Sequence, residues 1–277
     1  MSSYARMTGM LIRRLTLDDL DACCGLAEDR EWPPERHKWT LLFEVGEVYG
    51  IDAPDGDGLA ATTVLTRYGD DQAVVSMVLT ASRYARRGMA RGLMEHVLAG
   101  AGDRVVTLHA TEYGRPLYES LGFRTVGRVA KRTGVFRGGR SGRTRVATGA
   151  DLDGILALDA EVFGTDRSAL LRRMPGFGER VRVAEGGFGH CWRNDDSVVI
   201  GPVVARDEET ARALIADLAL DAGGEVRLDL DLAQESLTRW AGEHGIGDPW
   251  EVSLMARGGR PPGDRSRQFL PFMQALG

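Results

Sequence analysis

The chain has 277 residues, of which 43% are hydrophobic, 27% charged and 7% aromatic, a composition typical of globular proteins. At roughly 150 residues per domain, this length predicts about two domains. The formal charge of -5 disfavours nucleic-acid binding, which relies on clustered, unopposed Lys and Arg. No apolar stretch approaches the ~20 residues of a membrane span, and Met1 to Met10 lacks the apolar core of a secretion signal, so a cytoplasmic location is expected.

The three cysteines are predicted to be buried thiols. Cys23 and Cys24 are neighbours in a predicted helix, and Cys191 stands alone. None of them has the CxxC or Cys/His spacing of a metal site. We therefore expect neither a disulfide framework nor a bound metal.

A pattern near the N-terminus recurs 132 positions later. Arg13, Thr16, Asp19, Leu20 and Asp21 match Arg145, Thr148, Asp151, Leu152 and Asp153. In both copies a short strand-like segment leads to a Thr and an acidic cluster, which is typical of a capped helix start. Each half is thus predicted to open with a strand followed by a helix.

The elements after these openings also recur in the same order. Between the halves, residues 131–142 carry four glycines interspersed with basic residues, which predicts a solvated linker. The predicted strands are 58–66, 72–80, 104–108, 123–129, 197–204 and 226–230, and the predicted helices begin at 89, 113, 208 and 237. The fold class is therefore α/β with a mixed α+β sheet, divided into domains 1–135 and 136–277.

The segment from Arg83 to Arg91 is the strongest candidate for a binding site. It lies where a predicted strand ends and a helix begins, so several backbone N–H groups have no intrahelical partner. Together with the helix dipole these groups form a site suited to a diphosphate. Gly88 permits close approach of the backbone, and four arginines add positive charge. A solvated basic helix start is the alternative.

Two motifs resemble the GCN5-related N-acetyltransferase family. Its cofactor loop has the pattern Gln/Arg-x-x-Gly-x-Gly/Ala, of which Gly88 and Ala90 match while Ala85 departs. Downstream, residues 117–123 read Leu-Tyr-Glu-Ser-Leu-Gly-Phe, similar to the family's Leu-Tyr-Glu-x-Leu-Gly-Phe. Through Phe163-Gly164-Thr165-Asp166-Arg167 and Ile200-Gly201-Pro202, nearly the whole chain resembles tandem two-domain members of the YitH-like type, with a degenerate second domain.

The resemblance implies an N-acetyltransferase that moves an acetyl group from acetyl-CoA to a primary amine by direct attack. The acceptor would be a small-molecule or protein amine, and neither nucleic acid nor membrane is expected as a partner. Tyr118 matches the tyrosine that protonates the departing thiolate. The cofactor-binding residues implied by the match are Met77, Val78, Leu79, Thr80, Arg83, Ala85, Arg86, Arg87, Gly88, Met89, Ala90 and Arg91.

The general base is not fixed by this resemblance. Many relatives carry a Glu on the fourth strand, where this chain has Ser76 and Met77. The remaining candidates are His109, Glu112 and Glu44. The missing carboxylate leaves a non-catalytic acyl-CoA sensor or interaction module as the alternative function.

The second half lacks the corresponding cofactor residues. Its helix start reads Asp207-Glu208-Glu209, which would repel a diphosphate, and Ala241 stands where the tyrosine is expected. Asp166 and Arg167 are predicted either to line an acceptor pocket between the domains or to form a local helix cap and ion pair. Oligomeric state and the acceptor itself are not encoded in these patterns.

Overall fold

The computed structural model describes residues 11–195 and 197–277. Met1 to Met10, where the sequence predicts no secretion signal, lies outside the described residues. We call residues up to 135 the first half and residues from 136 onward the second half. Within the described ranges, no helix has the length and hydropathy needed to cross a bilayer.

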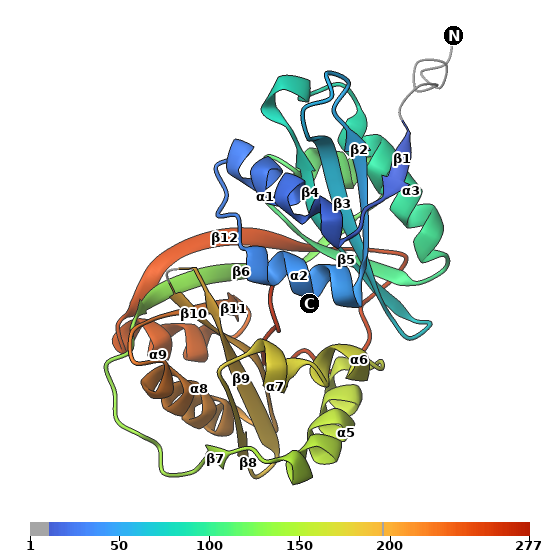
Figure 1. Cartoon of the computed structure of the whole chain (residues 1–277). Coiled ribbons are helices and arrows are strands. Elements are labelled where there is room, and N and C mark those ends of the chain that lie inside the picture. Colours follow the sequence, from blue (N-terminus) through green and yellow to red (C-terminus); the bar gives the residue numbers. More distant parts are fainter. Residues whose placement is uncertain (1–10, 196) are drawn as a thin grey trace.

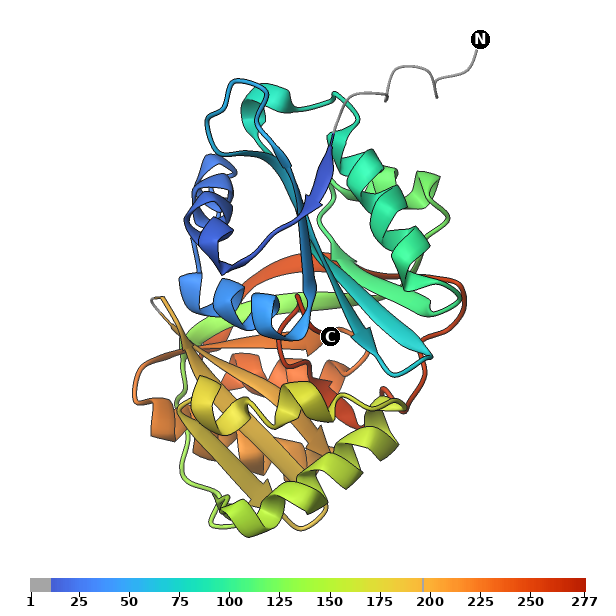
Figure 2. The ribbon, with the colours of Figure 1, turned by 45° about the vertical axis from the view of Figure 1, so that its right-hand side comes forward.

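The first half contains the strands and helices that surround the predicted loop. They are β1 (Ile12–Arg14), η2 (Leu17–Asp19), α1 (Leu20–Asp29), α2 (Arg36–Val45), β2 (Glu47–Asp52), β3 (Leu59–Tyr68), β4 (Gln72–Thr80), η3 (Ser82–Tyr84), α3 (Met89–Ala101), β5 (Val105–Ala110), α4 (Arg115–Ser120) and β6 (Arg124–Val135). Figure 2 shows α1 and α2 on one face of the strands and α3 on the other.

The sequence did not predict strand β2. Glycines and acidic residues in this stretch are typical of a loop, yet Gly50 packs closely against Leu15, because a Cβ there would lie 2.8 Å from a methyl group of that side chain. The interior strand position therefore suits glycine for a steric reason that local propensity does not reveal.

The second half repeats the order with additions. Its elements are β7 (Arg145–Val146), η4 (Gly149–Asp151), α5 (Leu152–Phe163), α6 (Ser168–Leu171), α7 (Met174–Phe177), β8 (Arg180–Ala184), β9 (Gly187–Asn194), β10 (Ser197–Ala205), α8 (Glu208–Ala222), β11 (Glu225–Asp231), α9 (Glu235–Glu243), β12 (Ile246–Arg257) and β13 (Gln268–Leu270). The predicted strands and helices of this half are present, while β8, β9, β12 and β13 were not anticipated.

The two halves share one sheet and exchange their long strands. The strand order is β1-β2-β3-β4-β5-β12-β6-β11-β10-β9-β8-β7, with β13 paired to β10. Thus β12 of the second half lies between β5 and β6, and β6 of the first half lies between β12 and β11 (Figure 1). The prediction that residues 131–142 form a solvated linker is wrong for residues 131–135. These residues belong to β6, which is hydrogen-bonded to β11 on one edge and to β12 on the other.

The repeated N-terminal pattern forms the same structure twice. Thr16 and Asp19 make a capping box at the start of η2, and Thr148 and Asp151 make one at η4. Arg13 approaches Asp19 at 2.6 Å, and the equivalent arginine approaches Asp151 at 2.5 Å. The predicted internal repeat is therefore confirmed at the level of individual hydrogen bonds.

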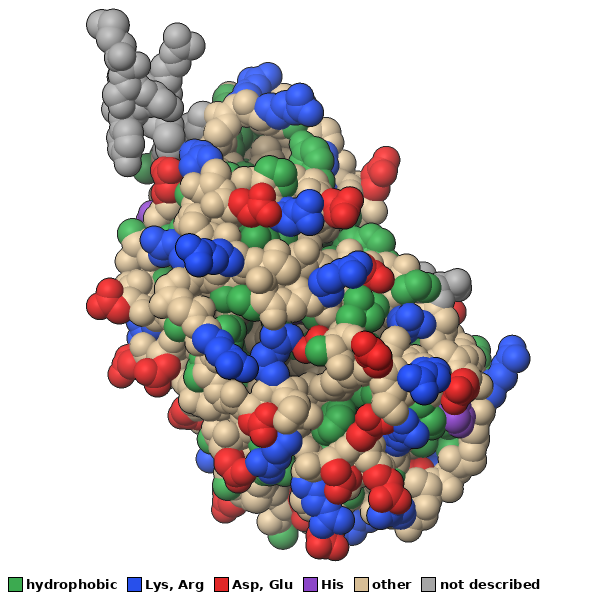
Figure 3. Space-filling view, turned by 180° about the vertical axis from the view of Figure 1, so that it is seen from behind, with side chains coloured by type: hydrophobic (Ala, Val, Ile, Leu, Met, Phe, Trp, Pro, Cys, Tyr) green, Lys and Arg blue, Asp and Glu red, His purple; other side chains and the backbone are tan. Residues whose placement is uncertain are grey.

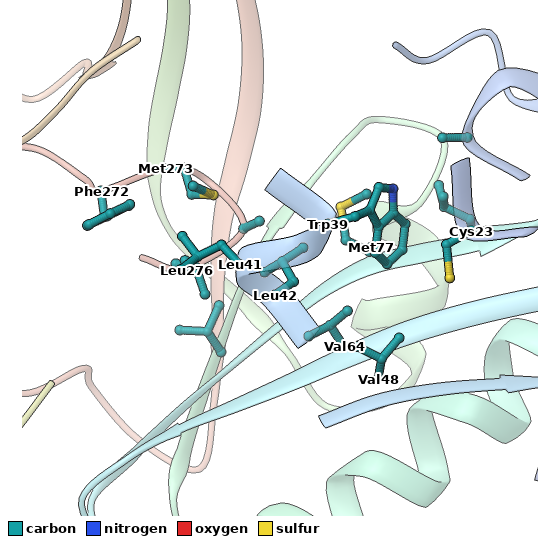
Figure 4. Packing of buried hydrophobic residues seen from close by; sticks show 14 of the residues in the cluster. Cys23, Trp39, Leu41, Leu42, Val48, Val64, Met77, Phe272, Met273 and Leu276 are labelled. Atoms are coloured by element: carbon teal, nitrogen blue, oxygen red, sulfur yellow. The ribbon is translucent and has the colours of Figure 1, made fainter. Parts of the chain in front are cut away.

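One hydrophobic cluster joins the halves. Trp39, Leu41 and Leu42 of α2 pack between strands of the first half and the C-terminal segment that carries Phe272 and Leu276 (Figure 4). Trp39, Leu42 and Phe272 are fully buried. The C-terminus consequently lies between the halves, so residues at the end of the chain can contact the first half (Figures 1 and 2).

Candidate active site

Strands β4 and β5 pair at one end and diverge at the other. Their parallel register covers only Gln72 to Val74 against Val105 to Thr107. Beyond this point β4 has a bulge, marked by a φ of 50° at Met77 and by a shift in its register with β3. Residues 77–80 therefore have a strand neighbour only on the β3 side, leaving backbone groups on the β5 side available to a ligand.

The loop before α3 presents further backbone donors at the mouth of this opening. Arg86 and Gly88 adopt left-handed φ values of 61° and 83°. Gly88 is the N-cap of α3, and no side chain within residues 11–195 or 197–277 caps that helix end. The first-turn N–H groups and the helix dipole therefore face whatever lies in front of the helix, which favours an anion.

A cavity of about 700 Å³ lies between these two features, and we call it the first cavity. All the predicted cofactor-binding residues except Arg83 line it: Met77, Val78, Leu79, Thr80, Ala85, Arg86, Arg87, Gly88, Met89, Ala90 and Arg91. The structure places Arg83 elsewhere, with its guanidinium 3.2 Å from Asp55 and 2.5 Å from the carbonyl of Asp57.

Arg30 and Trp32 also line this cavity, and sequence reasoning missed them. Both follow α1 and lie at least forty positions before β4, so no local pattern links them to the loop. The face seen in Figure 3 carries basic and acidic side chains interspersed, without a continuous area of one sign.

Tyr118 forms part of the wall of the first cavity. It lies on α4, and its ring meets Phe123 edge to face at 6.1 Å. Gly114 packs against the ring, since a Cβ there would lie 3.0 Å from Cε2. Burial raises the pKa of Tyr118 to about 12, so its hydroxyl keeps its proton at neutral pH and can donate it.

His109 is the one base candidate among the three that reaches this cavity. Its Nδ1 lies 2.8 Å from the carbonyl oxygen of Gln274. Because a carbonyl can only accept, Nδ1 carries the hydrogen, and Nε2 of the neutral ring is left as an acceptor. Burial lowers the pKa of His109, which favours this neutral form.

The structure places the other two candidates away from the site. Glu112 is exposed and does not line the first cavity. Glu44 accepts a 3.0 Å hydrogen bond from Arg173 of the second half. Its carboxylate thus takes part in an ion pair between the halves.

Comparisons with known proteins agree with this geometry. The acetyltransferase (GNAT) domain family matches residues 58–136, and a second acetyltransferase (GNAT) domain family matches residues 155–270. The chain is also 25% identical over 271 residues to YitH of Bacillus subtilis, an uncharacterized N-acetyltransferase, covering 92% of this chain and 93% of that protein. The chain belongs to the GNAT family of acetyltransferases.

Solved structures show the same tandem fold. An acetyltransferase candidate from Pyrococcus horikoshii superposes with a TM-score of 0.83 at 19% identity, covering 97% of this chain and 96% of that one. A GCN5-related N-acetyltransferase from Sphaerobacter thermophilus gives 0.66 at 18% identity, covering 93% and 98%. Together with the two family matches and the similarity to YitH, this identifies the chain as a GNAT-type N-acetyltransferase with two GNAT domains in tandem.

In the second GNAT domain, β10 and β11 also diverge, but strand β13 occupies the space between them. Strands β10 and β11 pair in parallel from Val198 to Ile200, and β10 then bulges before Val203. Here β13 pairs with β10, with Leu270 opposite Val203, and occupies the edge that β4 leaves open in the first domain. At the following helix, Asp207 caps α8 by accepting from the N–H of Thr210 at 2.8 Å.

The segment Asp166-Arg167 caps and braces the second domain. The Asp166 carboxylate accepts from the N–H of Ser168 at 2.7 Å, and buried Arg167 pairs with Asp159 at 2.8 Å. Arg167 also donates to the carbonyl of Gly277. The hypothesis that these two residues line an acceptor pocket is therefore wrong, and the alternative of a local cap and ion pair is confirmed.

Proposed function

We propose that this GNAT protein transfers an acetyl group from acetyl-CoA to a primary amine by direct attack, with acetyl-CoA held in the first cavity. The observation that carries the proposal is the opening between β4 and β5, with an uncapped helix N-terminus at its mouth. In this proposal residues 1–135 form the catalytic domain, and residues 136–277 form a degenerate domain that shapes the acceptor side.

The first cavity fits such a donor in two respects. Ser76 Oγ and Thr80 Oγ1 are buried in its wall without a hydrogen-bond partner among the described residues. Buried polar atoms of this kind are uncommon unless a ligand or water completes them. In addition, the backbone of residues 77–80 can pair with the amides of an extended pantetheine chain, while the N–H groups around Gly88 hold the diphosphate.

Once acetyl-CoA is bound, acetyl transfer to an amine needs few further groups from the protein. Acetyl-CoA supplies an activated thioester, so the chain needs to orient it and to manage two protons. Backbone donors on β4 can stabilise developing negative charge on the carbonyl oxygen, an effect worth about 3 kcal/mol per donor in acyl-transfer enzymes. Their position is fixed by the bulge at Met77.

We assign the two proton transfers to His109 and Tyr118. His109 would accept a proton from the amine at Nε2, directly or through a water, because its Nδ1 hydrogen is held by the Gln274 carbonyl. Tyr118 would give its phenolic proton to the departing sulfur. In this assignment His109 takes the role of the general base, which Ser76 and Met77 of β4 cannot fill.

Thiol release across a panel of primary amines tests the proposal. We expect acetyl-CoA to bind and free thiol to appear in an amine-dependent manner. Binding of acetyl-CoA without thiol release on any amine would contradict it and favour the acyl-CoA sensor.

A further inference from the structure

A second cavity of about 460 Å³ lies where the two halves meet, and we call it the junction cavity. It shares Trp32, Ser76, Met77 and His109 with the first cavity. The two cavities therefore meet beside the proposed base. The rest of the wall comes from the α1–α2 loop, α2 and β6 of the first half and from β9, β10, β11, β12 and the C-terminal segment of the second.

Two of the three cations that line the junction cavity are ion-paired. Lys38 is ion-paired with Glu35, and Arg227 binds Asp229 at 2.9 Å. Lys131 lies directly opposite Asp229 in the sheet register. It nevertheless makes no ion pair with any side chain that the structure describes. Glu31, an exposed carboxylate of the same wall, also makes no ion pair with a described side chain, so Lys131 is the unpaired cation of the cavity and Glu31 its unpaired carboxylate.

The Asp229 carboxylate is already occupied. One oxygen accepts from Arg227 Nε and from Gln274 Nε2, at 3.1 and 3.0 Å, and the other accepts from Arg227 Nη2. Lys131 is itself only half-exposed, and burial lowers its pKa. A partly desolvated ammonium of this kind gains from an anionic partner brought by a ligand.

Two uncharged polar groups from different halves also line the same cavity. Ser76 Oγ lies on the side shared with the first cavity, and Asn194 lines the side formed by the second half. Both Ser76 Oγ and Asn194 Oδ1 are buried and have no hydrogen-bond partner within the described part of the chain. Asn194 is only 8% exposed. A ligand with polar groups at both ends would satisfy them.

We propose that the acceptor is a primary amine that also carries an anionic group, a carboxylate or a phosphate, with its amine beside Ser76 and His109 and its anion at Lys131. The inference rests on the proposed function and adds the chemical class of the acceptor. Trp32 and Trp250 provide apolar walls for the carbon chain between the two groups.

Matched pairs of amines test this class. Acetyl-CoA-dependent thiol release is measured with lysine against cadaverine, aminobutyrate against butylamine, and phosphoethanolamine against ethanolamine. We expect at least one anionic member to exceed its neutral counterpart in kcat/KM by about tenfold or more, as one charge-assisted hydrogen bond provides. Comparing the carboxylate pairs with the phosphate pair separates the two anions.

Lys131→Met should remove this discrimination while leaving the affinity for acetyl-CoA unchanged. The control is Arg132→Met, since the neighbouring side chain on a strand points to the opposite face and Arg132 does not line the junction cavity. Turnover without preference for anionic amines, or a preference that survives Lys131→Met, would overturn the inference and leave the proposed function intact. Failure of every amine despite acetyl-CoA binding would instead overturn the proposed function.

Discussion

The two domains build one opening and complete it in different ways. In the first, β4 diverges from β5 after Val74, and among the described residues no strand pairs with residues 77–80 on that side and no side chain caps α3. In the second, β13 pairs with the equivalent edge of β10, and Asp207 caps α8. In the second domain, the backbone groups of the strand edge and the helix start are therefore hydrogen-bonded within the protein. In the first domain, the equivalent groups are available to a ligand.

The segment that fills the second domain also serves the first. After β13 the chain continues between the halves, where the Gln274 carbonyl meets His109. The Leu276 carbonyl accepts from Tyr68 at 2.7 Å, and the Gly277 carbonyl accepts from Arg167 at 2.9 Å. The chain segment that fills the opening of the second domain therefore also supplies the backbone carbonyl that holds His109 of the first. The following predictions test this division.

The largest expected effect is loss of acetyl-CoA binding in Gly88→Glu. The substitution places a carboxylate at the helix N-terminus and a side chain at a φ of 83°. Calorimetry should show affinity falling by about a hundredfold or more, from repulsion and lost backbone contacts. Gly223→Glu is the control, because Gly223 has a similar φ of 67° at the end of α8 in the second domain. Equal losses in both variants would contradict the assignment.

Tyr118→Phe should lower kcat by about a hundredfold, as removal of a general acid does. The affinity for acetyl-CoA should change little, because the ring and its packing remain. Tyr113→Phe is a matched control, since Tyr113 lines the same cavity but is 72% exposed. A Tyr118→Phe enzyme with normal kcat would show that another group protonates the sulfur.

His109 should titrate below the ordinary histidine pKa of ~6.5. Burial lowers its pKa, so the neutral, proton-accepting form persists at pH 6.5 and is lost only as pH falls further. NMR titration of labelled histidines, assigned with His109→Gln, measures this value directly. A midpoint at or above 6.5 would argue against a pre-formed neutral base.

We expect a smaller effect from His190 of the second domain, whose burial makes the stability of the protein depend on pH. It is fully buried, donates toward the Gly201 carbonyl, and burial lowers its pKa to about 4. Between pH 6.5 and 4, His190 is protonated in the unfolded chain but stays neutral in the folded chain. The free energy of unfolding therefore falls as the pH is lowered through this range. At pH 5 this contribution is about 2 kcal/mol.

Urea unfolding at pH 7 and pH 5 measures the loss of stability. His190→Gln should lose less stability than the unmodified protein over this interval, because it has no imidazole to protonate. Parallel losses in the two proteins would show that other groups account for the acid sensitivity.

Local sequence patterns predicted the elements that surround the first cavity. Strand β4 was predicted with its observed bounds, and α3 with its observed start, because apolar periodicity and Gly88 mark them clearly. The strand exchange was not predictable in this way, since β12 pairs with β5 over more than 130 residues. Neither was the partner of His109: the Gln274 carbonyl is a backbone group, and its position depends on the path of the whole second domain.

Hydrogen–deuterium exchange with and without acetyl-CoA tests the central claim most directly, because it observes the backbone amides themselves. We expect slower exchange at residues 77–80 and 86–91, with no change at residues 201–210. Protection of residues 201–210, or none in the first domain at saturating acetyl-CoA, would contradict it.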